Sequence, residues 1–563
     1  MMEYSIVVST PEKNICVCNL DELKESGSLS VEGFSLSYKV KDIKNIKLYE
    51  FTASGEGKCF ISLCGKGPEQ FYSFDGIVQE ERILRQSPHD PDHYHFKMDG
   101  TAVPMIGACD GKRTDVFVSD APAFCDNYTT QHIIPEKHEF YLSSGDPGGT
   151  PNYSGDPMNE YFHNLSEKDH VYKFIYFKTD SVTLKSIRRD MFKAVNEVWG
   201  KGGDSSYHAV SFSSNYMHYR RNETKTSDYW IVAGIQYANT QYNRDSFWQC
   251  WIMPEEISQQ CYWANSVDSV LQAENALFFV IWSYEVFKNG GKVKKDACDA
   301  AYKKIIDTLN LFGDGRYCPP GREDGSYRNW FDICCYERDD ADAYSQGLCV
   351  CALNCARELG YEVYDWKEKA VKYYMNLFNG DFVQMSMKKP YLALDYTVGE
   401  LLNYILFKEK FIPDEYVQKT YAHIMSSKAN TPYGVKIVSD VDGSYLTMDC
   451  FGAYGHVNPE MARMELGRYA NGGSYHIYEQ LFHIAAYVHN CEGALDNLIH
   501  RLMIDLDYDG ATHEYMHTLK GNGVKANQGW NAVICAMWDR LLARGEGDVR
   551  YFEEADKKLD SIV

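Results

Sequence analysis

The chain has 563 residues and a formal net charge of −22, so it is longer than one ordinary core requires and repels nucleic-acid phosphates and anionic lipid surfaces. No stretch approaches 18 uninterrupted apolar residues, and the first residues lack a signal-peptide pattern. We therefore expect no membrane partner and a cytoplasmic location. The 18 cysteines include no Cys-x-x-Cys pair, which argues against a structural zinc site and dithiol redox chemistry.

Up to about residue 180, apolar and polar residues alternate in short runs separated by Gly, Asp and Pro. A period near two is typical of antiparallel strands. The sequence therefore predicts a β-sandwich domain over residues 1–182. The expected strands are Tyr4–Ser9, Asn14–Cys18, Phe34–Val40, Lys58–Leu63, His93–Met98, His138–Leu142 and His170–Lys178.

From about Leu184 the apolar period becomes helical, which predicts a linker helix and loop over residues 183–224. The remainder, residues 225–563, has about a dozen helical segments and no repeat of solenoid type, so we expect a closed (α/α)6 toroid, a six-hairpin barrel. The fold class is α+β and multidomain. The expected helices are Ser246–Cys261, Val267–Lys288, Lys295–Leu311, Asp342–Leu359, Trp366–Leu377, Gly399–Phe407, Asp414–Ser426, Ser474–Val488 and Gly529–Leu542.

Two carboxylates from distant segments are suited to acid and base catalysis. Asp332 follows Trp330, and an apolar wall of this kind raises a carboxyl pKa and keeps the group protonated. Glu514 precedes a Gly-rich turn that leads to Trp530 and Asn531. Hydrolysis of a glycosidic bond needs one carboxylic acid to protonate the leaving oxygen and one carboxylate to activate water. We therefore predict Asp332 as the acid and Glu514 as the base.

Both assignments have alternatives. Asp332 could be a solvated loop residue, and Glu514 could pair with a neighbouring His or Lys. The acid could also be a neighbour of Asp332, namely Glu337, Asp339, Asp340 or Asp342.

Further segments offer groups that could bind a sugar. Arg244, Asp245 and Trp248 open a predicted helix, with Asp245 or Ser246 suited to the N-cap; the simpler alternative is that Asp245 only caps the helix and pairs with Arg244. Glycines before another predicted helix allow a ligand to approach the backbone. The expected substrate-binding residues are Arg244, Asp245, Trp248, Trp330, Gln346, Asn471, Tyr475, Trp530 and Asn531.

We expect no metal and no cofactor. His93 and His95 alternate along a predicted strand in the other domain, which does not favour a metal site.

Three segments, in this order, resemble motifs of the inverting (α/α)6-barrel glycosidases of the trehalase and processing glucosidase I type, the six-hairpin glycosidases. Tyr242–Phe247 is similar to their substrate-binding segment, and Asn329–Asp332 with Asp342–Leu348 is similar to their acid motif and the helix after it. Glu514-Tyr515, followed by Gly529–Ala532, is similar to their base region. The resemblance covers roughly residues 225 to 545 and implies this barrel, behind a β-sandwich, with Asp332 and Glu514 as catalytic residues.

The motifs also depart from the trehalase pattern. Arg244 replaces a tryptophan, Phe331 separates Trp330 from Asp332, and Asn531 stands where Thr or Ser is usual. These departures weaken an assignment to trehalose.

The sequence therefore predicts an inverting glycoside hydrolase that cleaves a small, α-linked oligosaccharide or glycoside. The expected partner is a small carbohydrate, and a homodimer is left open. One alternative is a sugar isomerase or polysaccharide lyase on the same toroid, which would depend on His476, His483 or His513. Another is a carbohydrate-binding protein without catalysis.

Overall fold

The computed structural model describes residues 2–31, 33–86, 103–120, 129–146, 148, 160–200, 207–211, 219–221, 229–231, 242–266, 274–319, 339–447, 450, 465–526 and 528–562. The chain forms two compact units. One comprises Met1–Gln241 with Asp556–Val563, and the other comprises Tyr242–Ala555.

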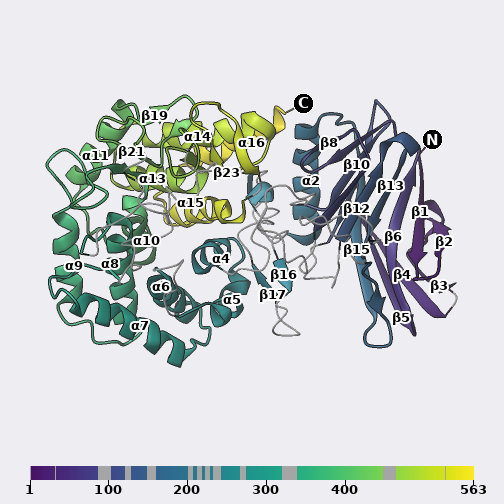
Figure 1. Ribbon diagram of the computed structural model, residues 1–563, viewed down its shortest axis with the longest axis horizontal. Coiled ribbons are helices and arrows are strands. Elements are labelled where there is room, and N and C mark those ends of the chain that lie inside the picture. The colour runs from purple at the N-terminus through teal and green to yellow at the C-terminus, as the bar shows by residue number, and fades with distance from the viewer. Residues whose placement is uncertain are drawn as a thin grey trace. The chain divides into compact units, whose positions relative to one another are not determined.

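The first unit contains two large antiparallel sheets (Figure 1). One has the strand order β2 (Asn14–Asn19), β1 (Glu3–Ser9), β6 (Lys58–Lys66), β13 (Glu139–Ser143), β12 (Thr129–Ile134) and β9 (Arg82–Gln86), with β14 (His163–Asn164) also paired to β6. The other has the order β3 (Ser26–Val31), β4 (Phe34–Ile43), β5 (Ile46–Gly55), β15 (His170–Thr179), β11 (Thr114–Ser119), β10 (Met105–Cys109), β7 (Gln70–Ser73) and β8 (Gly76–Val78).

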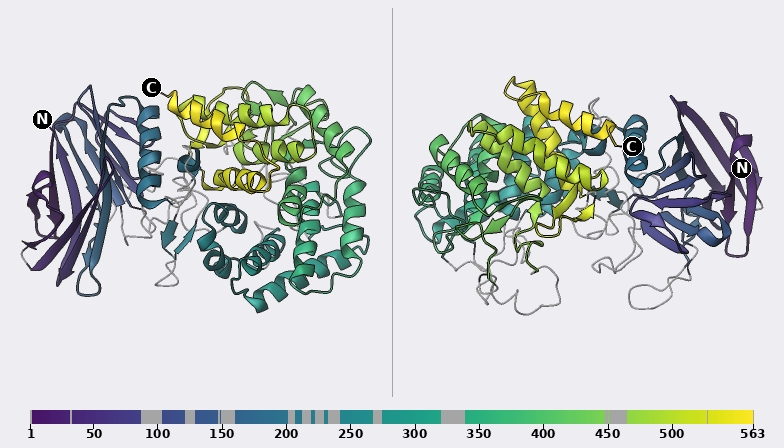
Figure 2. Two further views of the ribbon diagram at one scale, coloured as in Figure 1. Left: turned by 180° about the vertical axis from the view of Figure 1, so that it is seen from behind. Right: turned by 90° about the horizontal axis from the view of Figure 1, so that it is seen from above.

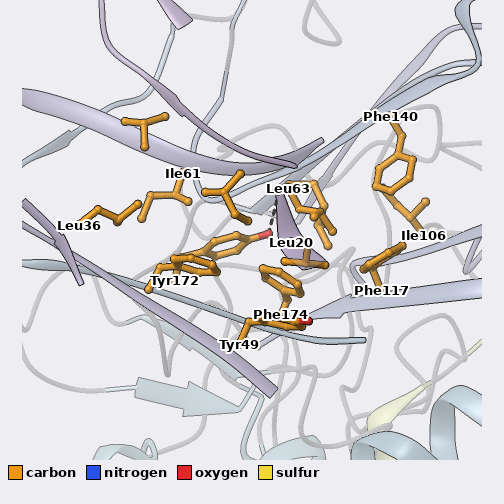
Figure 3. Close-up of a cluster of buried hydrophobic side chains, with 14 of the residues drawn as sticks. Leu20, Leu36, Tyr49, Ile61, Leu63, Ile106, Phe117, Phe140, Tyr172 and Phe174 are labelled. Atoms are coloured by element: carbon orange, nitrogen blue, oxygen red, sulfur yellow. Dashed lines mark hydrogen bonds between the residues drawn. The ribbon is translucent and has the colours of Figure 1, made fainter. Parts of the chain in front are cut away.

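The inner faces of the two sheets share one hydrophobic core (Figure 3). Ile61 and Leu63 come from one sheet, and Phe117, Tyr172 and Phe174 from the other. The Tyr172 hydroxyl donates a 2.8 Å hydrogen bond to the Leu142 carbonyl on the facing sheet. The arrangement is a β-sandwich, as the alternating sequence runs predicted.

Several strands were missed because their residues do not alternate. All five residues of β10 and all six of β11 are buried. β11 lies between the sandwich core and helix α2 (Leu184–Trp199), which packs on β11 and β15. A strand covered on both faces has no period of two to detect. The expected strand at His93–Met98 lies outside the described residues.

The second unit is a ring of helices in two layers (Figures 1 and 2). Among the described residues, six helices form the inner layer in chain order, and the ring closes where α4 contacts the 3-10 turn η8 (Gly529–Ala532) ahead of α15. The inner helices are α4 (Asn243–Gln249), α6 (Asn275–Lys288), α8 (Ala343–Glu358), α10 (Val398–Phe407), α13 (His476–Val488) and α15 (Val533–Ala543). Each is followed by an outer helix: α5 (Ile257–Trp263), α7 (Lys295–Asn310), α9 (Trp366–Met375), α11 (Asp414–Ser426), α14 (Ala494–Asp509) and α16 (Arg550–Asp560).

Burial explains why the two layers differ in sequence. The first fourteen residues of α8, from Ala343 to Ala356, are all buried, whereas α7 and α11 bury only one face. A helix with no charged residue on any face is suited to the inner layer, as in this stretch of α8, and an amphipathic helix is suited to the outer layer. The predicted fold, a β-sandwich followed by an (α/α)6 toroid, is confirmed.

Two local predictions in this unit were wrong. The expected helix Ser246–Cys261 is divided into α4 and α5, because Pro254 cannot continue a helix and starts a new 3-10 turn instead. Helices α14 and α16 were missed, although Gly493 and Gly510, both with positive φ, bound α14.

Candidate active site

The N-terminal ends of the inner helices bring polar and aromatic side chains together. Arg244, in the first turn of α4, forms an ion pair with Glu274 at the N-cap of α6 and lies 5.7 Å from the centroid of the Trp530 ring. The Trp530 ring lies 5.8 Å from Tyr478 in α13, and the Tyr478 ring lies 6.3 Å from Tyr344 in α8. We call Arg244, Glu274, Tyr344, Tyr478 and Trp530 the N-terminal cluster.

The cluster is rich in carboxylates around one cation. Arg244 also lies 3.4 Å from a carboxylate oxygen of Asp245, and Asp395 acts electrostatically on Tyr344 and Tyr478. Burial by itself lowers the pKa of Arg244, but Asp245 and Glu274 outweigh it and hold the pKa well above its ordinary value. Arg244 is therefore always positively charged. The negative charges of Asp245 and Glu274 balance it, so the cluster has no net positive charge.

The helix-capping prediction at this point was wrong in part. The N-cap of α4 is Tyr242, with no side-chain cap, so neither Asp245 nor Ser246 has that role. Asp245 instead pairs with Arg244, as the simpler alternative expected.

The buried polar groups of the cluster that face no hydrogen-bond partner in the described part of the chain include the Trp530 indole Nε1 and the Tyr344 hydroxyl. Burial raises the pKa of Tyr344 well above 10, so this hydroxyl stays protonated and can donate. Buried polar groups are normally hydrogen-bonded to protein or water. These two groups are suited to a ligand hydroxyl, and the aromatic rings beside them to the apolar face of a sugar.

Glu514 lies on a short strand beside this cluster. β23 (His513–Met516) pairs with β22 (Ser474–Tyr475), which leads directly into α13, and with β24 (Gly523–Ala526). Tyr475 is opposite Tyr515 in this register, with ring centroids 5.3 Å apart, and the Tyr475 ring is 6.5 Å from Trp530. The strand that carries Glu514 is therefore anchored next to Trp530, and Glu514 itself is buried.

Other predicted residues have different surroundings. Trp248 is fully buried and packs against Phe247, Trp251 and Phe278 in the interior of the ring. The Gln346 amide accepts from the Tyr317 backbone and donates to the carbonyls of Gly315 and Ala370, so it holds a loop to α8 and α9.

Asn471 and Asn531 both take part in backbone structure. Asn471 lies in a tight turn closed by backbone hydrogen bonds with Gly467 and Arg468. The Asn531 amide donates to the His513 carbonyl at 2.7 Å.

Asp332, Trp330 and Glu337 lie outside the described residues. Of the other acids that sequence left open, Asp342 accepts from the Ser345 backbone and caps α8, and Asp339 forms an exposed ion pair with Lys388. Asp340 is buried, accepts from the Ser386 hydroxyl at 2.5 Å and lines a cavity of about 490 Å³ with Arg316 and Lys372. Burial raises the pKa of Asp340. Among the acids in the described residues, Asp340 is therefore the best-suited alternative to Asp332 as the general acid.

Sequence reasoning missed Glu274, Asp395 and Tyr478 as candidate site residues. Glu274 fell inside a predicted continuous helix, whereas it is the N-cap of α6. The signal that could have found them is positional: each lies at, or within one turn of, the start of an inner helix or of the 3-10 turn ahead of it.

No protein-family model matches the chain, and no curated protein matches it. Solved structures do. A bacterial glucoamylase complexed with acarbose is similar at 10% identity and TM-score 0.38, over 99% of this chain and 88% of that chain. A GH63 mannosylglycerate hydrolase from Thermus thermophilus, in complex with glucose, is similar at 11% identity and TM-score 0.35, over 48% of this chain and 76% of that one.

The same hydrolase in complex with Tris and D-glycerate matches at 13% identity and TM-score 0.26, over 36% of this chain and 46% of that chain. An uncharacterized conserved protein from Thermus thermophilus has the same identity and TM-score, over 47% of its length. The chain thus spans about half the length of these two structures.

None of the helices in the described residues is long and apolar enough to cross a membrane.

Proposed function

We propose that the protein is an inverting glycoside hydrolase that cleaves a small, α-linked oligosaccharide or glycoside. Glu514 is the general base that activates water, and Asp332 is the general acid that protonates the leaving oxygen. The observation that carries the proposal is the position of the Glu514 strand beside the N-terminal cluster, where Tyr475 links Tyr515 to Trp530.

The cluster has the groups that binding of a neutral sugar requires. Trp530 and Tyr344 offer buried donors for ring hydroxyls, while Asp245 and Glu274 offer acceptors next to Arg244. Inversion requires the two catalytic carboxyl groups to be about 6.5–9.5 Å apart, so that a water molecule fits between Glu514 and the anomeric carbon.

The histidines that an isomerase or lyase would use are already engaged. Both ring nitrogens of His513 lie within 3.2 Å of Asp505 or Asp509 carboxylate oxygens. His483 is buried and bonded to the Tyr421 hydroxyl, and His476 is buried against Asp505. Their engagement favours hydrolysis over an isomerase or lyase reaction, in which histidine carries the proton.

The test is hydrolysis of a panel of aryl glycosides and disaccharides, with the anomeric form of the first product followed by NMR. We expect one α-linked substrate to give the β-anomer first. Glu514→Gln should lower kcat by about 10²–10⁴-fold, the usual share of general acid–base catalysis. The matched control is Glu415→Gln on outer helix α11, where an exposed carboxylate pairs with Lys419, and it should keep wild-type turnover.

The acid is decided by comparing Asp332→Asn with Asp340→Asn. If only Asp332→Asn loses turnover on substrates with poor leaving groups, Asp332 is the general acid. If only Asp340→Asn loses it, Asp340 is the general acid instead. Full activity of Glu514→Gln removes the base assignment. Sugar binding without any product identifies a carbohydrate-binding protein instead.

A further inference from the structure

A fully buried set of ionisable side chains contacts the strand that carries Glu514. Its centre is Asp505 on outer helix α14, whose carboxylate lies 3.0 Å from His513 Nδ1, 2.6 Å from Arg501 Nη1 and in short contact with His476 Nδ1. Arg501 in turn lies 2.9 Å from Glu479. We call Asp505, Arg501, His476, Glu479 and His513 the Asp505 network.

The network holds both strands that frame the site. Arg501 donates to the Ser474 carbonyl on β22 at 3.1 Å, and the Ser474 hydroxyl donates to Glu479 at 2.6 Å. On β23 it holds His513, the residue before Glu514. The outer helix α14 is thereby connected to the backbone of β22 at Ser474 and to the His513 side chain on β23.

The network has a geometric consequence for Glu514. Neighbouring residues of a strand point to opposite faces, so a contact that fixes the His513 ring also fixes the rotation of β23 and the direction of the Glu514 side chain. A catalytic group displaced by about 1 Å can lose on the order of 10²-fold in rate. A buried ion also requires well-placed partners, since an unpaired one is strongly destabilising.

We propose that Asp505 is a positioning residue for Glu514: by binding His513, His476 and Arg501 together it holds β23 in the orientation that catalysis requires. This inference rests on the proposed function, because it assigns Glu514 the role of base. Asp505 itself makes no contact with the N-terminal cluster among the interactions of the described residues.

The protonation states agree with this arrangement. Burial by itself lowers the pKa of His513, but hydrogen bonds to Asp505 and Asp509 outweigh it and raise the pKa to about 9. Burial lowers the pKa of His476, which is therefore neutral and donates to Asp505. The charged and titratable groups around His513 and Asp505 are Arg501, Asp509 and Tyr508 on α14 and His476, Glu479 and His483 on α13.

The C-terminal end of α13, the helix that begins with His476, offers a matched control. His489, the C-cap of α13, lies 3.1 Å from Glu400 on α10 and 2.7 Å from Asp414 on α11. His489 and Glu400 are as buried as His513 and Asp505. Because α13 has 13 residues, this second carboxylate–histidine pair is roughly 20 Å away along the helix.

The experiment compares Asp505→Asn, His513→Gln and Glu400→Gln in the full-length protein. The readouts are Tm, kcat and KM on the aryl glycoside that the wild type hydrolyses best, and amide hydrogen exchange of the 513–516 segment. We expect Asp505→Asn and His513→Gln to lower kcat at least tenfold with KM changed less than twofold, and to speed exchange in β23 at least tenfold. Glu400→Gln should lower Tm comparably while kcat and β23 exchange stay within twofold of wild type.

Equal effects of Asp505→Asn and Glu400→Gln on kcat and on β23 exchange would overturn the proposal, as would wild-type values in Asp505→Asn. If Asp505→Asn does not fold, His513→Gln decides by the same criteria. If the wild type hydrolyses nothing, the proposed function fails separately. Hydrogen exchange alone then decides whether Asp505 orders β23: selective acceleration supports the positioning role, and unchanged or equal exchange removes it.

Discussion

The Asn531 side-chain amide donates a 2.7 Å hydrogen bond to the main-chain carbonyl of His513. This bond ties the turn that carries Trp530 to the strand that carries Glu514. Both ends are buried, so the donor cannot be replaced by bulk water. Asn531 therefore fixes the spacing between an aromatic wall of the candidate site and its candidate base.

Replacing Asn531 with leucine should weaken both stability and turnover. The His513 carbonyl loses a buried donor, which costs about 1–3 kcal/mol in the free energy of unfolding. Urea unfolding measures this loss, and kcat should fall as well. Asn354→Leu breaks a buried amide pair with Asn403 between α8 and α10 and should lower stability alone. A normal kcat in Asn531→Leu would show that the bond has no role in the site.

Trp530→Phe should separate binding from stability. The substitution keeps an aromatic ring but removes an indole N–H that has no protein partner in the described residues. Since no hydrogen bond to protein is lost, Tm should stay within a few degrees of wild type. If the N–H donates to substrate, KM should rise by roughly tenfold, the equivalent of about 1.4 kcal/mol. A large fall in Tm with unchanged KM would assign Trp530 to packing.

Removing only one partner of the Arg244–Glu274 ion pair should lower the free energy of unfolding more than removing both partners. Arg244→Met leaves Asp245 and Glu274 buried without their cation, and we expect a loss of about 3–5 kcal/mol in the free energy of unfolding. The double variant Arg244→Met/Glu274→Gln should recover part of this loss. A double-mutant cycle by urea unfolding measures the coupling. Strictly additive losses would mean that the two side chains act independently.

The sandwich unit should lose stability as the pH falls below about 6.5, the ordinary pKa of histidine. His170 is buried, stacks on His163 with ring centroids 3.5 Å apart and shares a 2.7 Å hydrogen bond with the Ser144 hydroxyl. Burial, with smaller effects of His163 and Lys168, lowers the pKa of His170 well below 6.5.

The sign follows from proton linkage. Above about pH 6.5 His170 is neutral in both the folded and unfolded chain, so it adds no pH dependence. Below that pH the unfolded chain binds a proton that the folded chain rejects, so folding weakens. Urea unfolding at pH 7, 6 and 5 gives the free energy of unfolding at each pH. This free energy should fall less steeply with decreasing pH in His170→Gln than in wild type. An unchanged slope would mean that other groups determine the acid sensitivity of this unit.

Local sequence patterns predicted much of the secondary structure. Helix α11 begins and ends where the sequence predicted, at Asp414 and Ser426, because its apolar period of about 3.6 is undisturbed. β11 was missed because it is covered on both faces, and the helix through Pro254 was predicted too long. An apolar period is visible in the sequence only when one face of an element is buried. Proline interrupts a helix for a steric reason, which the pattern of apolar residues does not show.

The sequence alone determined the order of sandwich and helical ring, and the presence of a carboxylate next to aromatic residues at Glu514. These features depend on side-chain chemistry within a few residues. Only the tertiary structure decided that Arg244, Glu274, Tyr344, Tyr478 and Trp530 meet, and that Asp505 on α14 holds the Glu514 strand. Ring closure brings together helix ends that are far apart in the sequence, and no local pattern records which side chains then share a buried, low-dielectric space.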